Sequence, residues 1–230
     1  MKVCVVVLLL LTSAVACMGQ QVMYSNLRDL REAQGDTVST LRVLRRTKKQ
    51  MLTLGGADYR IVADDNSGLS RYLRVRCYAV EVDGQLYVNC RKMRYRRYKF
   101  GHWYAPAMMI DGRVFFRAQP LGQLASSSFI PIDAVRLGGD VGNAIAVTSL
   151  VNDRVYYELD MQTGRSSFLS KERMRELLAS YPEKQAALDK ELTESAAIMQ
   201  KYLTFLENGG DPGDTIDADS VGAPRPVVHE

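Results

Sequence analysis

The sequence predicts an α+β protein: an antiparallel, hairpin-rich sheet with two C-terminal helices packed on it. Two observations carry this prediction. Segments rich in β-branched and aromatic residues, joined by tight turns, fill the middle of the chain, whereas helical periodicity dominates only near its end. Strands followed by helices are typical of an α+β domain, because the sheet must bury a face and the helices can cover it.

The composition is that of a globular protein with a packed core, since 47% of the 230 residues are hydrophobic and 24% are charged. We expect one domain over residues 21–208, between a signal peptide at 1–20 and a disordered acidic tail at 209–230. Five of the 26 acidic residues lie in that tail beside a single basic residue, Arg225. The rest of the chain therefore carries a net positive charge. A basic body indicates modest attraction to anionic polymers or membrane surfaces, but it names no partner.

The first twenty residues predict an export signal. Lys2 is followed by an apolar run at 3–11, too short for a membrane span, and by small residues before Cys17. Residues 14–17 also resemble a lipobox, in which Cys17 would be acylated. Cleavage after Gly19 would instead remove Cys17. We therefore expect the protein in the periplasm or at the cell surface, or anchored in the outer membrane if Cys17 carries a lipid.

The first elements of the mature chain are short. Residues 24–33 predict a helix capped by Ser25, and residues 37–46 predict a strand. Residues 51–63 are strand-like but broken by two glycines. The composition of residues 64–68, Asp-Asp-Asn-Ser-Gly, predicts a loop.

Three hairpins are predicted next, over residues 76–90, 103–118 and 144–159. Their turns are Asp83-Gly84, Asp111-Gly112 and Asn152-Asp153, pairs that tolerate positive φ. The implied register pairs Val80 with Tyr87, Met109 with Val114, Ala107 with Phe116 and Leu150 with Val155.

The first of these hairpins also predicts a disulfide. Counting outward from its turn places Cys77 opposite Cys90 at a non-hydrogen-bonded position, where Cα atoms approach to about 4.5 Å. Export implies an oxidising compartment, so we expect the two thiols to be bridged. The alternative is two buried free thiols. A bridge would leave Cys17 unpaired, which acylation would explain.

Two helices are predicted after residue 169. Ser170 caps the first, in which Met174, Leu177, Leu178 and Tyr181 recur on one side. The second is predicted as one long helix over residues 183–207. Its apolar stripe consists of Leu188, Leu192, Ala196, Met199, Leu203 and Leu206. Packing on the sheet explains the stripe, and a coiled-coil seam is the alternative.

The one segment with marked chemical character is residues 91–104, RKMRYRRYKFGHWY. Guanidinium groups bind phosphates and carboxylates, and aromatic faces stack on sugars or bases. The candidate ligand-binding residues are Arg94, Tyr95, Arg96, Arg97, Tyr98, His102 and Trp103. The alternative is a solvated connection whose aromatic rings cover the core beneath the arginine stems.

Catalytic signals are sparse. His102 and His229 are the only histidines, and the sequence has neither a nucleophile elbow nor zinc-ligand spacing. We therefore expect no catalytic residue, no metal and no cofactor, and we lean towards a non-enzymatic protein. The alternative is an enzyme that acts on envelope glycans or peptides through His102 or carboxylates.

The export signal, RCYAVEVDGQLYVNC, YYELDMQTG and SKERMRELL together resemble a family of uncharacterised exported proteins of Bacteroidota-type bacteria. That resemblance implies no assigned activity and supplies no catalytic residue. We expect an exported cell-envelope protein that serves as an interaction or structural module. Its partner would be an anionic envelope polymer or another envelope protein. Nucleic acid is not expected, and a lipid anchor would be the only contact with the membrane.

Overall fold

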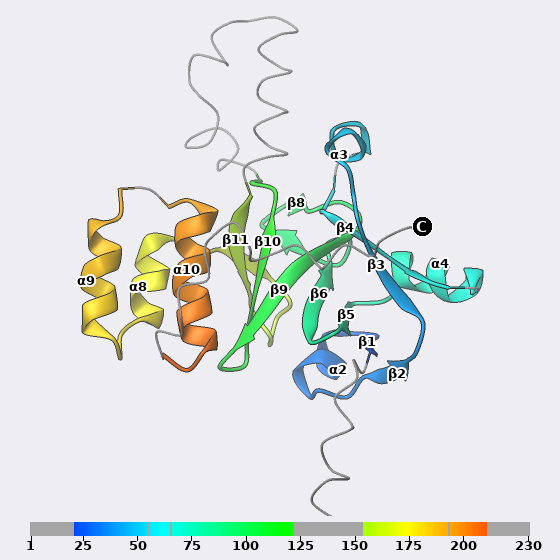
Figure 1. Ribbon diagram of the computed structural model, residues 1–230, viewed down its shortest axis with the longest axis horizontal. Helices are drawn as coiled ribbons and strands as arrows, with labels where there is room; N and C mark the ends of the chain where they lie inside the picture. The colour runs from blue at the N-terminus through cyan, green and yellow to red at the C-terminus, as the bar shows by residue number, and fades with distance from the viewer. Residues whose placement is uncertain (1–20, 55, 65, 122–153, 193, 211–230) are drawn as a thin grey trace, which may run out of the picture. The chain divides into compact units, whose positions relative to one another are not determined.

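The computed structural model describes residues 21–54, 56–64, 66–121, 154–192 and 194–210. The predicted signal peptide, Cys17 and the acidic tail lie outside the described residues. The chain divides into two compact units at Phe168/Leu169, the first built around a sheet and the second from helices. The α+β class is confirmed (Figure 1). The packing of the helices on the sheet stays a prediction.

The first unit contains one sheet, ordered β2-β1-β5-β6-β9-β10-β11-β12-β7-β8. Strand β4 also pairs with β9, and β3 pairs with β4. Every pairing is antiparallel except that of β12 with β7. The strands are β1 (Gln21–Tyr24), β2 (Asp36–Val38), β3 (Leu41–Arg45), β4 (Tyr59–Ala63), β5 (Ala79–Val82), β6 (Gln85–Asn89), β7 (Arg94–Tyr95), β8 (Tyr98–Lys99), β9 (Tyr104–Ile110), β10 (Arg113–Ala118), β11 (Val155–Leu159) and β12 (Ser166–Phe168). The helices of this unit are α2 (Leu27–Arg31), α3 (Lys48–Leu54) and α4 (Ser67–Val75).

Two of the predicted hairpins are confirmed with their register. β5 and β6 pair Val80 with Tyr87, and β9 and β10 pair Met109 with Val114. The first residue of each turn has positive φ, 53° at Asp83 and 50° at Asp111, as a tight turn matching the strand twist requires. The first arm of the third hairpin lies outside the described residues; its second arm, β11, pairs with β10.

The sheet carries one apolar core on each face. Side chains alternate between the faces along β6, so Leu86 and Val88 belong to the first core and Tyr87 to the second. Helix α2 and residues 91–103 contribute to the first core. Helix α4, β3 and β4 contribute to the second. Both faces are therefore covered by segments that precede or interrupt the hairpins.

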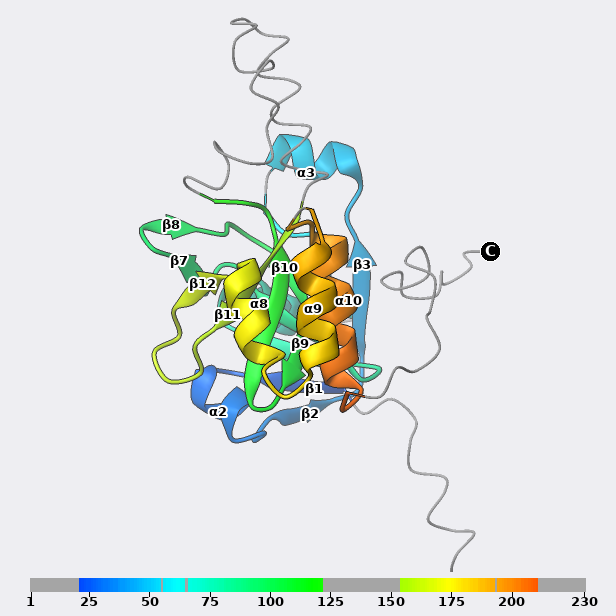
Figure 2. The same cartoon turned by 90° about the vertical axis from the view of Figure 1, so that its left-hand side faces the viewer.

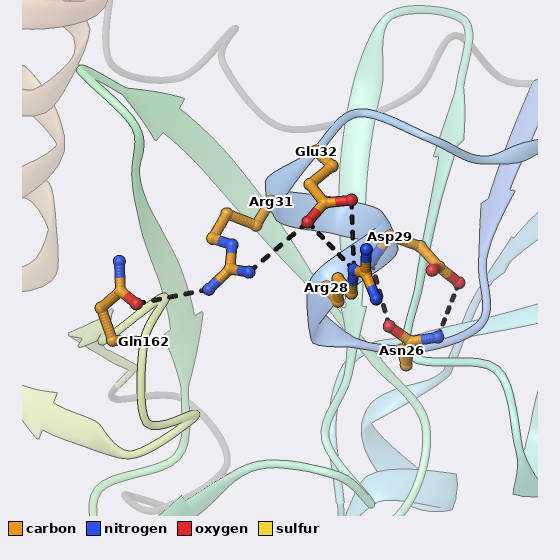
Figure 3. A network of polar contacts seen from close by, with 6 residues as sticks. All are labelled: Asn26, Arg28, Asp29, Arg31, Glu32 and Gln162. Atoms are coloured by element: carbon orange, nitrogen blue, oxygen red, sulfur yellow. Dashed lines mark hydrogen bonds and ion pairs between the residues drawn. The ribbon is translucent and has the colours of Figure 1, made fainter.

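Helix α2 is shorter than the predicted helix over residues 24–33, and its cap is Asn26, one residue after the predicted cap Ser25. The Asn26 side chain accepts a hydrogen bond from the backbone N–H of Asp29 at 3.0 Å and donates one to its carboxylate at 2.8 Å (Figure 3). Arg31 reaches Gln162, in the turn between β11 and β12, at 3.3 Å. The Arg31–Gln162 contact ties α2 to a turn far away in the sequence.

The structure corrects the prediction for residues 48–75. Helix α3 replaces the start of the predicted strand, and only β4 remains of it. Residues 67 and 68, at the end of the predicted loop, instead form the start of α4. Asn66 caps that helix by accepting from the N–H of Leu69 at 2.8 Å, and Ser70 bonds the backbone of Ala63. The loop-forming residue types were also helix-capping types, and burial of Leu73 in the second core favours the helix.

The second unit contains α8 (Lys171–Leu177), α9 (Pro182–Lys190) and α10 (Ala196–Glu207) (Figure 2). Ser170 caps α8, as predicted. The prediction of one long second helix is wrong. Glu191 has extended backbone that ends α9, and Ser195 caps α10. Leu192, predicted on the continuous stripe, is 99% exposed because it lies in the break.

The predicted Cys77–Cys90 disulfide is also wrong: within the described ranges, both cysteines are free and buried. Cys90 belongs to the first core and Cys77 to the second, so the two thiols lie on opposite faces of the sheet. Cys77 departs from the strand alternation because its N–H still bonds Tyr72 at the end of α4, at 3.1 Å. Burial raises the pKa of Cys77 to about 11 and also raises that of Cys90.

Candidate functional site

Residues 91–103 form an excursion that leaves β6 and returns beside it. The backbone N–H of Cys90 donates to the carbonyl of Trp103 at 2.8 Å, which closes the excursion. Inside it, β7 and β8 form a short hairpin that continues the sheet beyond β12. Arg96, at φ 53°, makes the turn. We call residues 91–99 the basic hairpin.

The side chains of the excursion are sorted by polarity. Met93 and Phe100 are buried in the first core, and Phe100 lies edge-on to the rings of Phe116 and Tyr157, with centroids at 5.2 and 4.6 Å. All six basic residues of the basic hairpin are exposed: Arg91, Lys92, Arg94, Arg96, Arg97 and Lys99. The apolar side chains thus fix the hairpin to the core and leave its cations facing solvent.

The two tyrosines of the hairpin lie under its arginines. Tyr95 packs against Tyr157, with ring centroids 5.5 Å apart. The guanidinium of Arg96 lies 5.4 Å from the Tyr95 ring, and that of Arg97 lies 5.2 Å from the Tyr98 ring. This is the geometry expected of a connection whose aromatic rings cover the core. It also holds the guanidinium groups in place at the surface.

No carboxylate of the described residues pairs with the charges of the basic hairpin. Among the described residues, none of its six cations forms an ion pair, whereas Arg28, Arg42 and Arg113 pair with Glu32, Asp64 and Glu158. Exposed cations that are close together in the chain create a positive local potential. The arrangement therefore suits anions better than it suits a neutral ligand.

His102 and Trp103 have partners other than the tyrosines of the hairpin. The Nδ1 atom of His102 lies 3.1 Å from Nη1 of Arg91. The Trp103 ring is partly buried, with the guanidinium groups of Arg46 and Arg60 at 5.2 and 5.7 Å. Trp103 has φ 79°, a conformation that costs a bulky residue free energy. The seven predicted residues thus form two groups.

Sequence reasoning missed a buried polar cluster beside Trp103. Arg46 donates to the carbonyl of Ala57 at 2.6 Å, and Arg154 donates from Nε to Asp58 at 3.0 Å. Burial lowers the pKa of Arg46, and the nearby Asp58 carboxylate partly offsets this. Residues 58 and 154 are far apart in the sequence, so no local pattern signals their pairing. Arg46 also donates to the carbonyl of Gln50 in α3 at 2.9 Å and lies over the Trp103 ring, so the cluster links α3 to the excursion.

The described residues offer chiefly electrostatic binding chemistry. Within them, no group of three or more His, Cys, Asp or Glu side chains is placed to hold a metal ion. The two thiols are buried and have raised pKa values, which disfavours the nucleophilic thiolate. None of the described helices is long and apolar enough to cross a membrane.

Comparisons with known proteins give one match. The model of a family described as a family of unknown function (DUF6563) matches residues 22–209. This stretch includes the sheet, both cores, the basic hairpin and the C-terminal helices. No curated protein and no solved structure matches the chain.

Proposed function

Because this chain belongs to the family of unknown function DUF6563, its role has to be inferred from its own residues, and we propose that it is an exported, non-enzymatic interaction module of the cell envelope. Its binding surface is the basic hairpin, and its partner is an anionic envelope polymer. The export signal in residues 1–20 supports the location.

One observation carries the binding proposal: six exposed cations on a short hairpin, none of them in an ion pair with a described carboxylate. Exposed cations lose little free energy of hydration when they meet an exposed anion. Arginine forks also match phosphate and carboxylate geometry. Because Met93 and Phe100 anchor the hairpin backbone in the core, the points from which its cations project are fixed before a ligand arrives, which lowers the entropic cost of binding.

Charge reversal in the hairpin tests the binding proposal. We expect the variant R94E/R96E/R97E to elute from phosphocellulose at neutral pH at a clearly lower salt concentration than the unaltered protein. Three cations that would face phosphate become anions that repel it. Elution in a salt gradient is the measurement.

The matched control is R45E/K48E/K190E, which changes the net charge equally at three exposed positions outside residues 91–99. We expect this control to elute much closer to the unaltered protein. Equal losses of retention in the two variants would mean that net charge alone governs binding. That result would reject the hairpin as the site.

The location is tested at Cys17. In a bacterium that processes lipoproteins, we expect the protein to fractionate with the envelope and to incorporate labelled palmitate, because a lipobox cysteine is the acylation site. The variant Cys17→Ala should lose the label. An unlabelled but exported protein would refute the lipid anchor alone, and retention in the cytoplasm would refute export.

A further inference from the structure

The cations of the basic hairpin belong to a larger set of basic residues, carried by the segments that adjoin one end of the β5–β6 hairpin. Residues 67–99 contain nine basic and two acidic residues. Both acids lie near the turn: Asp83 makes it, and Glu81 is in β5. Helix α4 enters β5, and residue 91 leaves β6, at the opposite end. The sequence between α4 and β8 is therefore strongly polarised in charge.

A buried amide joins α4 to the basic hairpin at that end. Asn89 is fully buried, and its Nδ2 atom donates to the carbonyls of Leu73 at 3.1 Å and Cys77 at 2.8 Å. Its Oδ1 atom accepts from the backbone N–H of Arg91 at 3.1 Å. The last turn of α4 is thus held beside the first residue of the hairpin. Arg76, next to Cys77, and Arg91 are brought to the same end of the sheet.

Helix α4 and its C-cap carry three exposed arginines: Arg71, Arg74 and Arg76. Among the described residues, none of the three forms an ion pair. The dipole of the helix favours cations near its C-terminus, which accounts for Arg74 and Arg76. Arg71 lies a turn earlier and gains little from the dipole, and like charges three residues apart repel each other. A bound polyanion would remove that repulsion.

We infer that α4 and the basic hairpin together bind one linear, phosphate-bearing polymer that runs from Arg71 to the β7–β8 turn. This inference rests on the proposed function and extends it from a single anion to a chain of regularly spaced charges. The hairpin alone can hold a small anion. Binding by both groups at once gives a long chain an advantage, because its second contact is intramolecular.

The test compares pyrophosphate with long-chain polyphosphate as probes, using titrations of the full chain at several salt concentrations. Neutralising the helix in R71Q/R74Q/R76Q should reduce the slope of log affinity against log salt for long-chain polyphosphate by about 2, at about 0.7 per lost phosphate contact. Pyrophosphate binding should be unchanged. The variant R94Q/R96Q/R97Q should weaken the binding of both probes. The control R45Q/K48Q/K190Q should alter neither slope.

Different results would refute the extended surface and the proposed function. If the hairpin variant weakens binding and the α4 variant leaves the polyphosphate slope unaltered, the extended surface is refuted and the proposed function stands. If neither variant changes binding, the proposed function is refuted as well. Circular dichroism before each titration checks that the variants are folded.

Discussion

Replacing Phe100 by Ala is expected to lower the free energy of unfolding by about 3–5 kcal/mol. Phe100 is 1% exposed and contacts the edges or faces of Phe116 and Tyr157 in the first core. Truncation would leave a cavity between those rings, and the aromatic pairs add to the loss. Urea denaturation followed by circular dichroism measures the change.

The matched control is Met109→Ala, in strand β9 of the same sheet. Met109 is 44% exposed, so its truncation removes little buried surface and should cost less than about 0.5 kcal/mol. Phe100→Leu should give an intermediate loss. A loss for Phe100→Ala as small as that of the control would show that the basic hairpin is not anchored by this ring.

Replacing Asn89 by Ala is expected to cost about 3 kcal/mol, because a fully buried amide with three hydrogen bonds would be removed. The carbonyl of Leu73 would keep its bond from the Tyr104 hydroxyl at 2.7 Å. The carbonyl of Cys77 and the N–H of Arg91 would each lose the Asn89 side chain as partner. Unpaired buried polar groups cost about 1–3 kcal/mol each.

Gln85→Ala is the control for Asn89, since both are amides of strand β6. Gln85 donates to the carbonyls of Leu86 at 2.9 Å and Ala107 at 2.8 Å, but its side chain is exposed. Water can replace those bonds, so the loss should be about 1 kcal/mol or less. Similar losses for the two variants would contradict the anchoring role that we give to Asn89. Unfolding by urea, read at the same protein concentration, compares them.

The sequence predicted the strand registers that are set by a neighbouring turn. An Asp-Gly turn sets the register of the strands on either side, so Val80–Tyr87 and Met109–Val114 could be paired by counting. Counting did not place the cysteines, because the end of α4 displaces Cys77 from the strand alternation. A helix that was itself not predicted thus decided which face the Cys77 thiol occupies.

The positions of the helix ends were also only partly predictable from neighbouring residues. Ser170 was predictable as a cap, whereas Asn66 was assigned to a loop, because asparagine and serine favour both caps and turns. The break between α9 and α10 interrupts the apolar stripe whose spacing predicted one helix over residues 183–207. Periodicity reports which residues share a face if a helix forms, but not where the helix ends.

For the candidate site, the basic and aromatic character of residues 91–104 was evident from the sequence. Its division was not: Phe100 enters the core, Trp103 joins Arg46 and Arg60, and the cations stay outside. The α4 arginines were not associated with the site at all. The link between α4 and the first residue of the hairpin depends on Asn89, whose carbonyl partners are twelve and sixteen residues away.

By itself, the sequence determined the α+β class, two hairpins with their registers and the charge of the surface segment, because turn chemistry and charge are properties of neighbouring residues. Only the tertiary structure decided the faces of Cys77 and Cys90, the position of α4 and its link through Asn89 to the first residue of the basic hairpin. Those outcomes depend on burial and on hydrogen bonds between segments far apart along the chain, which residue patterns do not encode locally.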